Sequence, residues 1–138
     1  MTPAELIEKL ERADGPSREL DAALKANFYG GVPMLSPFNG NWCVYRDGAS
    51  DPRKDRVMER PRHVPHEVWA NDRYTASIDA AMTLVPEGWS YTVAWLHRNG
   101  RATVAMFHAK LNEQRAESHT PALALCIAAL KAKEADNG

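Results

Sequence analysis

Aromatic and basic side chains gather in one stretch of the sequence, between the N-terminal region and the C-terminal half. Flat rings stack on nucleobases, and the arginine guanidinium group binds phosphate or carboxylate through paired N–H groups. The candidate ligand-binding residues are Trp42, Tyr45, Arg46, Trp69, Arg73 and Tyr74. Further cations in the same stretch are Arg53, Lys54, Arg56, Arg60 and Arg62. The pattern predicts a site for a small anionic or nucleotide ligand, for a nucleic acid, or for an acidic protein surface. The alternative is that the rings anchor a long loop to the core while the charges stay in water.

The overall charge limits what such a site can bind. Lys plus Arg total 17 and Asp plus Glu total 18, so the formal net charge is −1. Proteins that bind duplex nucleic acid or acidic membranes normally carry a large positive footprint. The longest apolar run, residues 121–130, is shorter than the roughly 20 residues that span a bilayer. We therefore expect a cytoplasmic protein whose partner is neither duplex nucleic acid nor a membrane.

Two histidines in the sequence HVPHE superficially resemble a zinc-binding helix. A helical zinc pair needs histidines four residues apart on one face, whereas His63 and His66 are three apart with Pro65 between them. A metal site in a loop would need His97, His108 or a carboxylate to approach them. A small metal-dependent hydrolase is therefore kept as an alternative function, and we expect no bound metal or other cofactor.

Nucleophilic catalysis finds little support in the sequence. Cys43 and Cys126 lie far apart and lack the spacing of zinc or redox motifs, so we expect reduced thiols. Cys126 falls on an apolar helical stripe, which favours a buried structural thiol. The sequence carries neither a nucleophile elbow nor a phosphate-binding glycine motif. It therefore favours a protein without enzymatic activity.

Two helices are expected at the N-terminus. Thr2 and Glu5 have the spacing of a capping box, with proline at the first helical position. The Gly-Pro pair at 15–16 interrupts the helix, and Ser17 can cap a second helix that ends near Asn27.

From residue 28 to 70, glycine and proline recur too often for long elements. Residues 41–46, NWCVYR, have the aromatic and β-branched content of a strand. Residues 51–62 mix five basic with three acidic side chains, which is typical of a solvated surface segment.

The C-terminal half predicts a helix followed by a β-hairpin. Thr75 or Ser77 can cap a helix that runs to Val85. The β-rich runs 89–97 and 101–109 flank an Asn-Gly pair, which is preferred in two-residue hairpin turns.

A two-residue turn sets the pairing of this hairpin. It would place Trp95 opposite Val104, Val93 opposite Met106, and Tyr91 opposite His108. We assign the face that these six residues share to the core. The other face is also poor in charge, so we expect a helix, a loop or a second subunit to cover it.

The chain is expected to end in a helix after a polar connection over residues 111–119. Thr120 is the expected cap. The expected buried stripe is Leu123, Cys126, Ile127 and Leu130. Since Leu125 makes the opposite side nearly as apolar, this helix should be the most buried. Lys131 and Lys133 are expected at its C-terminal end, where cations are favoured.

The segments YTASIDAAMTLVPEGWSYTV and HTPALALCIAALKA resemble small proteins encoded by phages and prophages, the phage ABA (α-β-α) sandwich domain family. The resemblance covers residues 74–133, about half of the chain. It implies a layered α-β-α fold and a phage origin. It supplies neither an established reaction nor catalytic residues.

Together these features predict one α+β domain over residues 1–138. A small antiparallel sheet, the hairpin 89–97/101–109, is expected to pack between α-helices in an α-β-α sandwich-like arrangement. Its parts would be N-terminal helices over 1–27, an aromatic and basic insert over 28–70, and a helix-hairpin-helix core over 71–138. Because a lone hairpin is marginal in water, it needs a third strand. That strand would come from residues 41–46 or from a second copy, which would make a homodimer.

The function expected from this reading is that of a phage or prophage accessory protein. It would be a non-enzymatic binding protein acting on a host protein or a small anionic or nucleotide ligand, with counter-defence as one role. The alternatives are the metal-dependent hydrolase and a structural or assembly factor of the virion.

Overall fold

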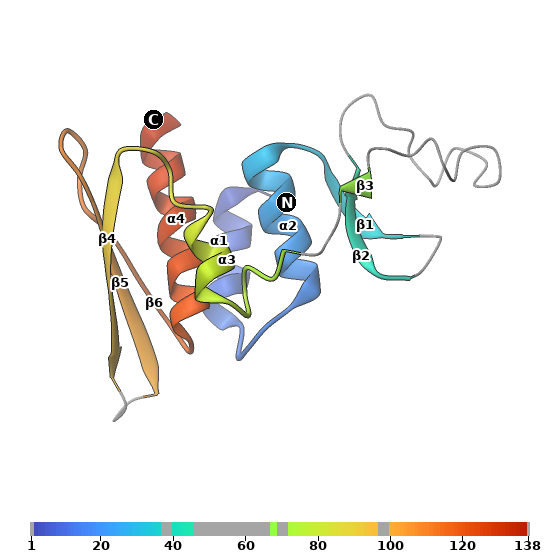
Figure 1. The fold of residues 1–138 in the computed structure, drawn as a ribbon, viewed down its shortest axis with the longest axis horizontal. Helices are drawn as coiled ribbons and strands as arrows, with labels where there is room; N and C mark the ends of the chain where they lie inside the picture. Colours follow the sequence, from blue (N-terminus) through green and yellow to red (C-terminus); the bar gives the residue numbers. More distant parts are fainter. Residues whose placement is uncertain (1, 37–39, 46–66, 69–71, 97–99, 138) are drawn as a thin grey trace. The chain divides into compact units, whose positions relative to one another are not determined.

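The computed structural model describes residues 2–36, 40–45, 67–68, 72–96 and 100–137 (Figure 1). The chain divides into two compact units: unit 1 comprises Met1–Ser17 and Arg73–Gly138, and unit 2 comprises Arg18–Asp72. The secondary structure mixes α-helices with two small antiparallel sheets, which confirms the α+β class. Among the described residues, no helix combines the length and the apolar character needed to cross a bilayer.

The helices of unit 1 begin where the sequence predicts. They are α1 (Pro3–Arg12), α3 (Ile78–Met82) and α4 (Pro121–Asn137). Each has a hydroxyl oxygen that accepts a hydrogen bond from a backbone N–H three residues later. Thr2 accepts from Glu5 at 3.2 Å, Ser77 from Ala80 at 3.2 Å, and Thr120 from Leu123 at 3.1 Å. These caps satisfy backbone donors that the first turn would otherwise leave unpaired. Of the two caps proposed for α3, Ser77 is the one used.

The sheet of unit 1 has the order β4-β5-β6, with every neighbouring pair antiparallel. Its strands are β4 (Trp89–Leu96), β5 (Arg101–His108) and β6 (Gln114–Ser118). The third strand is therefore β6, and the prediction that residues 41–46 fill this place is wrong. The polar sequence at 111–119 was expected to be a connection. This segment instead contains β6, in which Ala116 and Ser118 are buried while Arg115 and Glu117 are exposed.

The predicted hairpin register is wrong by two residues. Trp95 lies opposite Ala102, Val93 opposite Val104, and Tyr91 opposite Met106. Leu96 pairs with Arg101, so four residues connect the strands, of which 97–99 lie outside the described residues. Gly100 has a φ of +61°, a left-handed conformation that glycine adopts readily. Because a slip of two keeps each side chain on its face, the predicted division into two faces survives.

One face of this sheet packs against α4. Ala102, Val104 and Met106 of β5 are fully buried on that face. On the other face Ser90, Thr92 and Ala94 are exposed, and Phe107 is 40% exposed. Ala105 on the same face is 9% exposed, but the exposure of the other residues shows that the expected helix or loop does not cover this face as a whole among the described residues.

α4 is the centre of unit 1. Its residues 122–130 are all buried, with Leu123, Leu125, Cys126 and Ile127 completely so. The sheet packs on one side of α4, and α1 and α3 also pack against it (Figure 1). The prediction that this is the most buried helix is confirmed. The helix continues to Asn137, so Lys131 and Lys133 do not lie in its last turn as expected.

Unit 2 consists of α2 (Arg18–Tyr29) and a sheet of three short strands. The strands are β1 (Val32–Leu35), β2 (Trp42–Tyr45) and β3 (Glu67–Val68), in the order β1-β2-β3. α2 runs two residues beyond the predicted end and stops at Gly30, whose φ is +88° and whose N–H bonds to the carbonyl of Ala26 at 2.8 Å. Because α2 packs on β1 and β2, unit 2 is wider than the predicted insert 28–70.

Candidate functional site

The six predicted ligand-binding residues fall into three groups. Trp42 and Tyr45 lie on β2 of unit 2, whereas Arg73 and Tyr74 belong to unit 1. Arg46 and Trp69 lie outside the described residues, as do Arg53, Lys54, Arg56, Arg60 and Arg62. The structure therefore bears on the proposed site mainly through Trp42 and through the strands that flank the basic segment.

Trp42 is held on the core of unit 2 without being enclosed by it. This core contains the fully buried Ala22 and Val44, and both Ala26 and Trp42 pack against it while partly buried. An indole fixed in this way keeps part of its surface in contact with solvent. It combines a low conformational freedom with an accessible ring, as a stacking platform requires.

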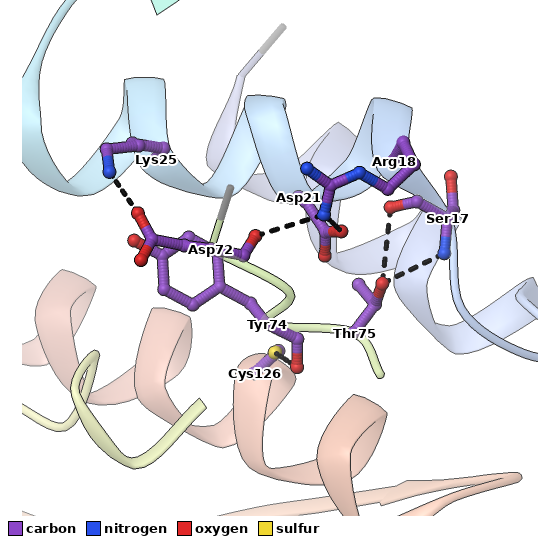
Figure 2. Close-up of polar contacts among 8 residues, drawn as sticks. All are labelled: Ser17, Arg18, Asp21, Lys25, Asp72, Tyr74, Thr75 and Cys126. Atoms are coloured by element: carbon purple, nitrogen blue, oxygen red, sulfur yellow. Dashed lines mark hydrogen bonds and ion pairs between the residues drawn. The ribbon is translucent and has the colours of Figure 1, made fainter. Parts of the chain in front are cut away.

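Tyr74 does not offer such a surface. Only 2% of the residue is exposed, and its carbonyl accepts a hydrogen bond from the Cys126 thiol at 3.3 Å (Figure 2). The neighbouring Arg73 is exposed. Tyr74 therefore contributes to the core of unit 1, and we leave it out of the candidate ligand-binding set. A single tyrosine beside a short helix has no periodic neighbours that would reveal its burial from sequence.

Where the chain leaves unit 1 and returns to it, two residues of that unit bond reciprocally. The Ser17 N–H donates to Thr75 Oγ1 at 2.9 Å, and the same hydroxyl donates to the Ser17 carbonyl at 3.2 Å (Figure 2). Thr75 is 1% exposed. This pair joins residues 58 positions apart in the sequence and so connects the two chain segments that form unit 1.

The first and last residues of unit 2 are joined by a separate polar cluster. Arg18 Nη1 donates to Asp21 Oδ2 at 2.8 Å and to the Asp72 carbonyl at 3.4 Å (Figure 2). Lys25 forms an ion pair with the Asp72 carboxylate. Asp21 is 2% exposed, so its charge needs this compensation. Arg18 and Lys25 are both paired with carboxylates. We therefore interpret the cluster as a link between the two ends of unit 2 and not as an anion site.

Neither cysteine is placed for catalysis. Both thiols are buried. Cys43 Sγ donates to the Met34 carbonyl at 3.4 Å, and Cys126 bonds to the Tyr74 carbonyl as described. A catalytic thiol needs an accessible, activated thiolate. The prediction that Cys126 is a buried structural thiol is confirmed.

His108 has a structural environment. Its ring lies 5.1 Å from that of Trp89, at an angle of 50°, and its Nδ1 accepts the Lys110 N–H at 3.0 Å. The Trp89 indole N–H in turn bonds to both carboxylate oxygens of Asp136, at 3.1 and 3.2 Å. An Nδ1 that accepts a hydrogen bond leaves the proton of the neutral ring on Nε2. His108 is thus half-buried with its Nδ1 bonded to the backbone, while His97 lies outside the described residues.

Ser118, His119 and Asp14 match a hydrolytic triad by residue type, but their placement is unsuitable. Ser118 is completely buried, and its Oγ has no hydrogen-bond partner among the described residues. His119 Nε2 is 3.9 Å from Asp14 Oδ1, too long for a hydrogen bond. A substrate cannot reach a serine that is shielded from solvent, so this group does not support hydrolysis.

The described residues also contain no cluster of three or more His, Cys, Asp or Glu side chains that could hold a metal ion. His63 and His66 lie outside those residues. Comparison with known proteins finds no matching family model, curated protein or solved structure.

Proposed function

We propose that the protein is a phage or prophage accessory protein that binds a small anionic or nucleotide ligand without catalysis, and that unit 2 carries the binding surface. The resemblance of residues 74–133 to phage proteins supports the origin. The observation that carries the binding proposal is the half-buried Trp42 on β2, because that strand runs directly into the basic segment.

The pairing of β2 with β3 explains how a small scaffold would present this segment. Tyr45 ends β2 and lies directly opposite Glu67, the first residue of β3. The chain therefore leaves and rejoins the sheet at one point. The intervening residues 46–66 contain six basic and four acidic side chains. Loops carried by a rigid scaffold often hold binding residues, and arginine is well suited to phosphate oxygens.

This geometry also provides a precise deletion. Directly opposed residues of antiparallel strands have Cα atoms about 4.5–5.5 Å apart, so a two-residue turn can join them. Replacing residues 46–66 by Asn-Gly should convert β2 and β3 into a tight hairpin and leave α2 and β1 in place. Circular dichroism should show unchanged helix content.

Calorimetric titration with ATP tests the proposal on the full chain and on this replacement. We expect the replacement to weaken ATP binding at least about tenfold, the effect of roughly 1.4 kcal/mol. A second variant keeps the length of the segment but changes Arg46, Arg53, Lys54, Arg56, Arg60 and Arg62 to Gln, and it should lose binding similarly. Undiminished binding by a folded replacement would contradict the assignment to unit 2.

Tripolyphosphate separates the role of the ring from that of the charges. The variant Trp42→Leu should weaken ATP binding because the base loses its stacking surface. It should leave tripolyphosphate binding nearly unchanged, since that ligand has no base. Equal weakening for both ligands would show that Trp42 supports the fold of unit 2 rather than the nucleotide.

A further inference from the structure

The strand β4 forms an edge of the unit 1 sheet, and it differs from the other sheet edges in the described residues. Its sequence WSYTVAWL spans eight residues without a charge or a proline. Of the other edge strands, β1 contains Pro33, β3 has two residues, and β6 carries Arg115 and Glu117. Proline, shortness and charge are the common means by which proteins prevent pairing at an edge. β4 has none of these protections.

Ion pairs accompany the charges on the opposite edge of the same sheet. Arg101 bonds to Glu117 at 2.6 Å, and Arg115 forms an ion pair with Glu113. The hydrogen bond to the Glu113 carboxylate and its negative charge both raise the pKa of Arg115. A strand that approached β6 would therefore meet a charged border. The two edges of this sheet differ in chemistry, and only β4 is suited to an uncharged strand.

The side chains of β4 on the helix-bearing face are apolar and partly open to solvent. Val93 lies opposite Val104, which is completely buried, yet Val93 itself is 38% exposed. Trp95 lies opposite Ala102, also completely buried, and is likewise 38% exposed. The cause is the position of α4, which packs chiefly on β5 and β6. An added strand beside β4 would cover these side chains on the face where the core already lies.

We propose that β4 pairs antiparallel with β4 of a second copy across a two-fold axis, joining two three-stranded sheets into one. A strand without charge meets no like charge in a copy of itself, and two-fold pairing is the usual way in which identical chains associate. A charged peptide would find no complementary charge along β4. The proposal is independent of the ligand bound by unit 2.

We place the two-fold axis at Val93, the central residue of the apolar set Tyr91, Val93 and Trp95. Centring the axis on Val93 places the two Val93 side chains opposite each other and Tyr91 opposite Trp95 of the second copy. All of these side chains then share the helix-bearing face. Shifting the pairing by one residue would place Val93 opposite Thr92 or Ala94, whose side chains lie on the other face of the sheet.

Charge substitution at the axis tests both the interface and its register. Sedimentation equilibrium on the full chain should give twice the 15.4 kDa monomer mass. Val93→Lys and Val93→Glu should each raise the dimer dissociation constant at least about tenfold, because like charges would then face each other. Mixing the two variants should restore the dimer, since Lys would face Glu. A monomeric wild-type chain, or a mixture that stays monomeric, would overturn the proposal.

Phe107→Lys is the matched control. Phe107 is 40% exposed on the central strand and on the other face of the sheet, so its substitution should leave the dimer intact. If Phe107→Lys dissociates the dimer and Val93→Lys does not, the copies associate face to face and the proposal fails. Hydrogen exchange of the unmodified chain provides a readout that needs no variant. Amides of β4 should become more protected as protein concentration rises, and protection that is independent of concentration would contradict the pairing.

Discussion

The Thr75 hydroxyl connects the two chain segments that form unit 1. It donates to the carbonyl of Ser17 and accepts from the N–H of the same residue, and it is 1% exposed. The sequence identifies both residues only as possible helix caps. Their hydrogen bonds join positions 58 residues apart. Secondary-structure propensity and local residue spacing cannot predict a contact between residues so distant in the sequence. The burial of Tyr74 escaped prediction for the same reason, because its partner Cys126 lies on a helix far along the chain.

The exchange Thr75→Val tests this pair. Valine preserves the shape of threonine but leaves the partly buried N–H and carbonyl of Ser17 without that partner. We expect a loss of about 1–3 kcal/mol in the free energy of unfolding, measured by urea denaturation. The control Thr75→Ser keeps the hydroxyl and should cost less, about 1 kcal/mol for the lost methyl group. An equal loss in both variants would show that packing of the methyl group, and not the hydrogen bonds, is responsible.

At the scale of elements, the outcome of each prediction depended on how much local signal the element carries. Caps and apolar spacing located α1 and α4, and the strand content of 41–46 located β2. β6 was missed because, after Gln114, its residues alternate charged and small side chains, a pattern that also suits a surface connection. The hairpin register was wrong because four residues connect β4 to β5, not the two of the Asn-Gly pair that the prediction assumed. The candidate site could be predicted only as a composition of aromatic and basic residues, since the positions of their side chains depend on pairing between distant strands.

The complete burial of α4 leads to a prediction about both of its sides. Leu125, outside the predicted stripe, is as fully buried as Leu123 within it. Leu125→Ala and Leu123→Ala should therefore each reduce the free energy of unfolding by about 2–5 kcal/mol, as expected for a large-to-small change in a core. Glu134→Ala, at an exposed position of the same helix, should change it by less than about 0.5 kcal/mol. A small effect of Leu125→Ala in thermal or urea unfolding would mean that α4 has an open side.

At the scale of the whole molecule, unit 2 is an insertion between two parts of unit 1. The sequence predicted an inserted segment from its glycines, prolines and aromatic residues, but α2 looked like a continuation of the N-terminal helices. Its assignment to unit 2 follows from packing against β1 and β2, and from the ion pair of Lys25 with Asp72. Each unit thus has its own sheet and its own polar contacts between distant parts of its chain. This organisation allows a binding surface on unit 2 while unit 1 keeps a separate core around α4.

The four tryptophans allow the most direct test of the central claim, that unit 2 binds an anionic ligand. Trp42 and Trp69 belong to unit 2, and Trp89 and Trp95 to unit 1. A nitrogen–proton correlation spectrum of the labelled full chain, with its indole signals assigned by substitution, can be recorded as ATP is added. We predict that the Trp42 and Trp69 signals move with saturation while the Trp89 signal, fixed by its bonds to Asp136, stays in place. Shifts confined to Trp89 and Trp95, or no shift at saturating ATP, would contradict the assignment of binding to unit 2.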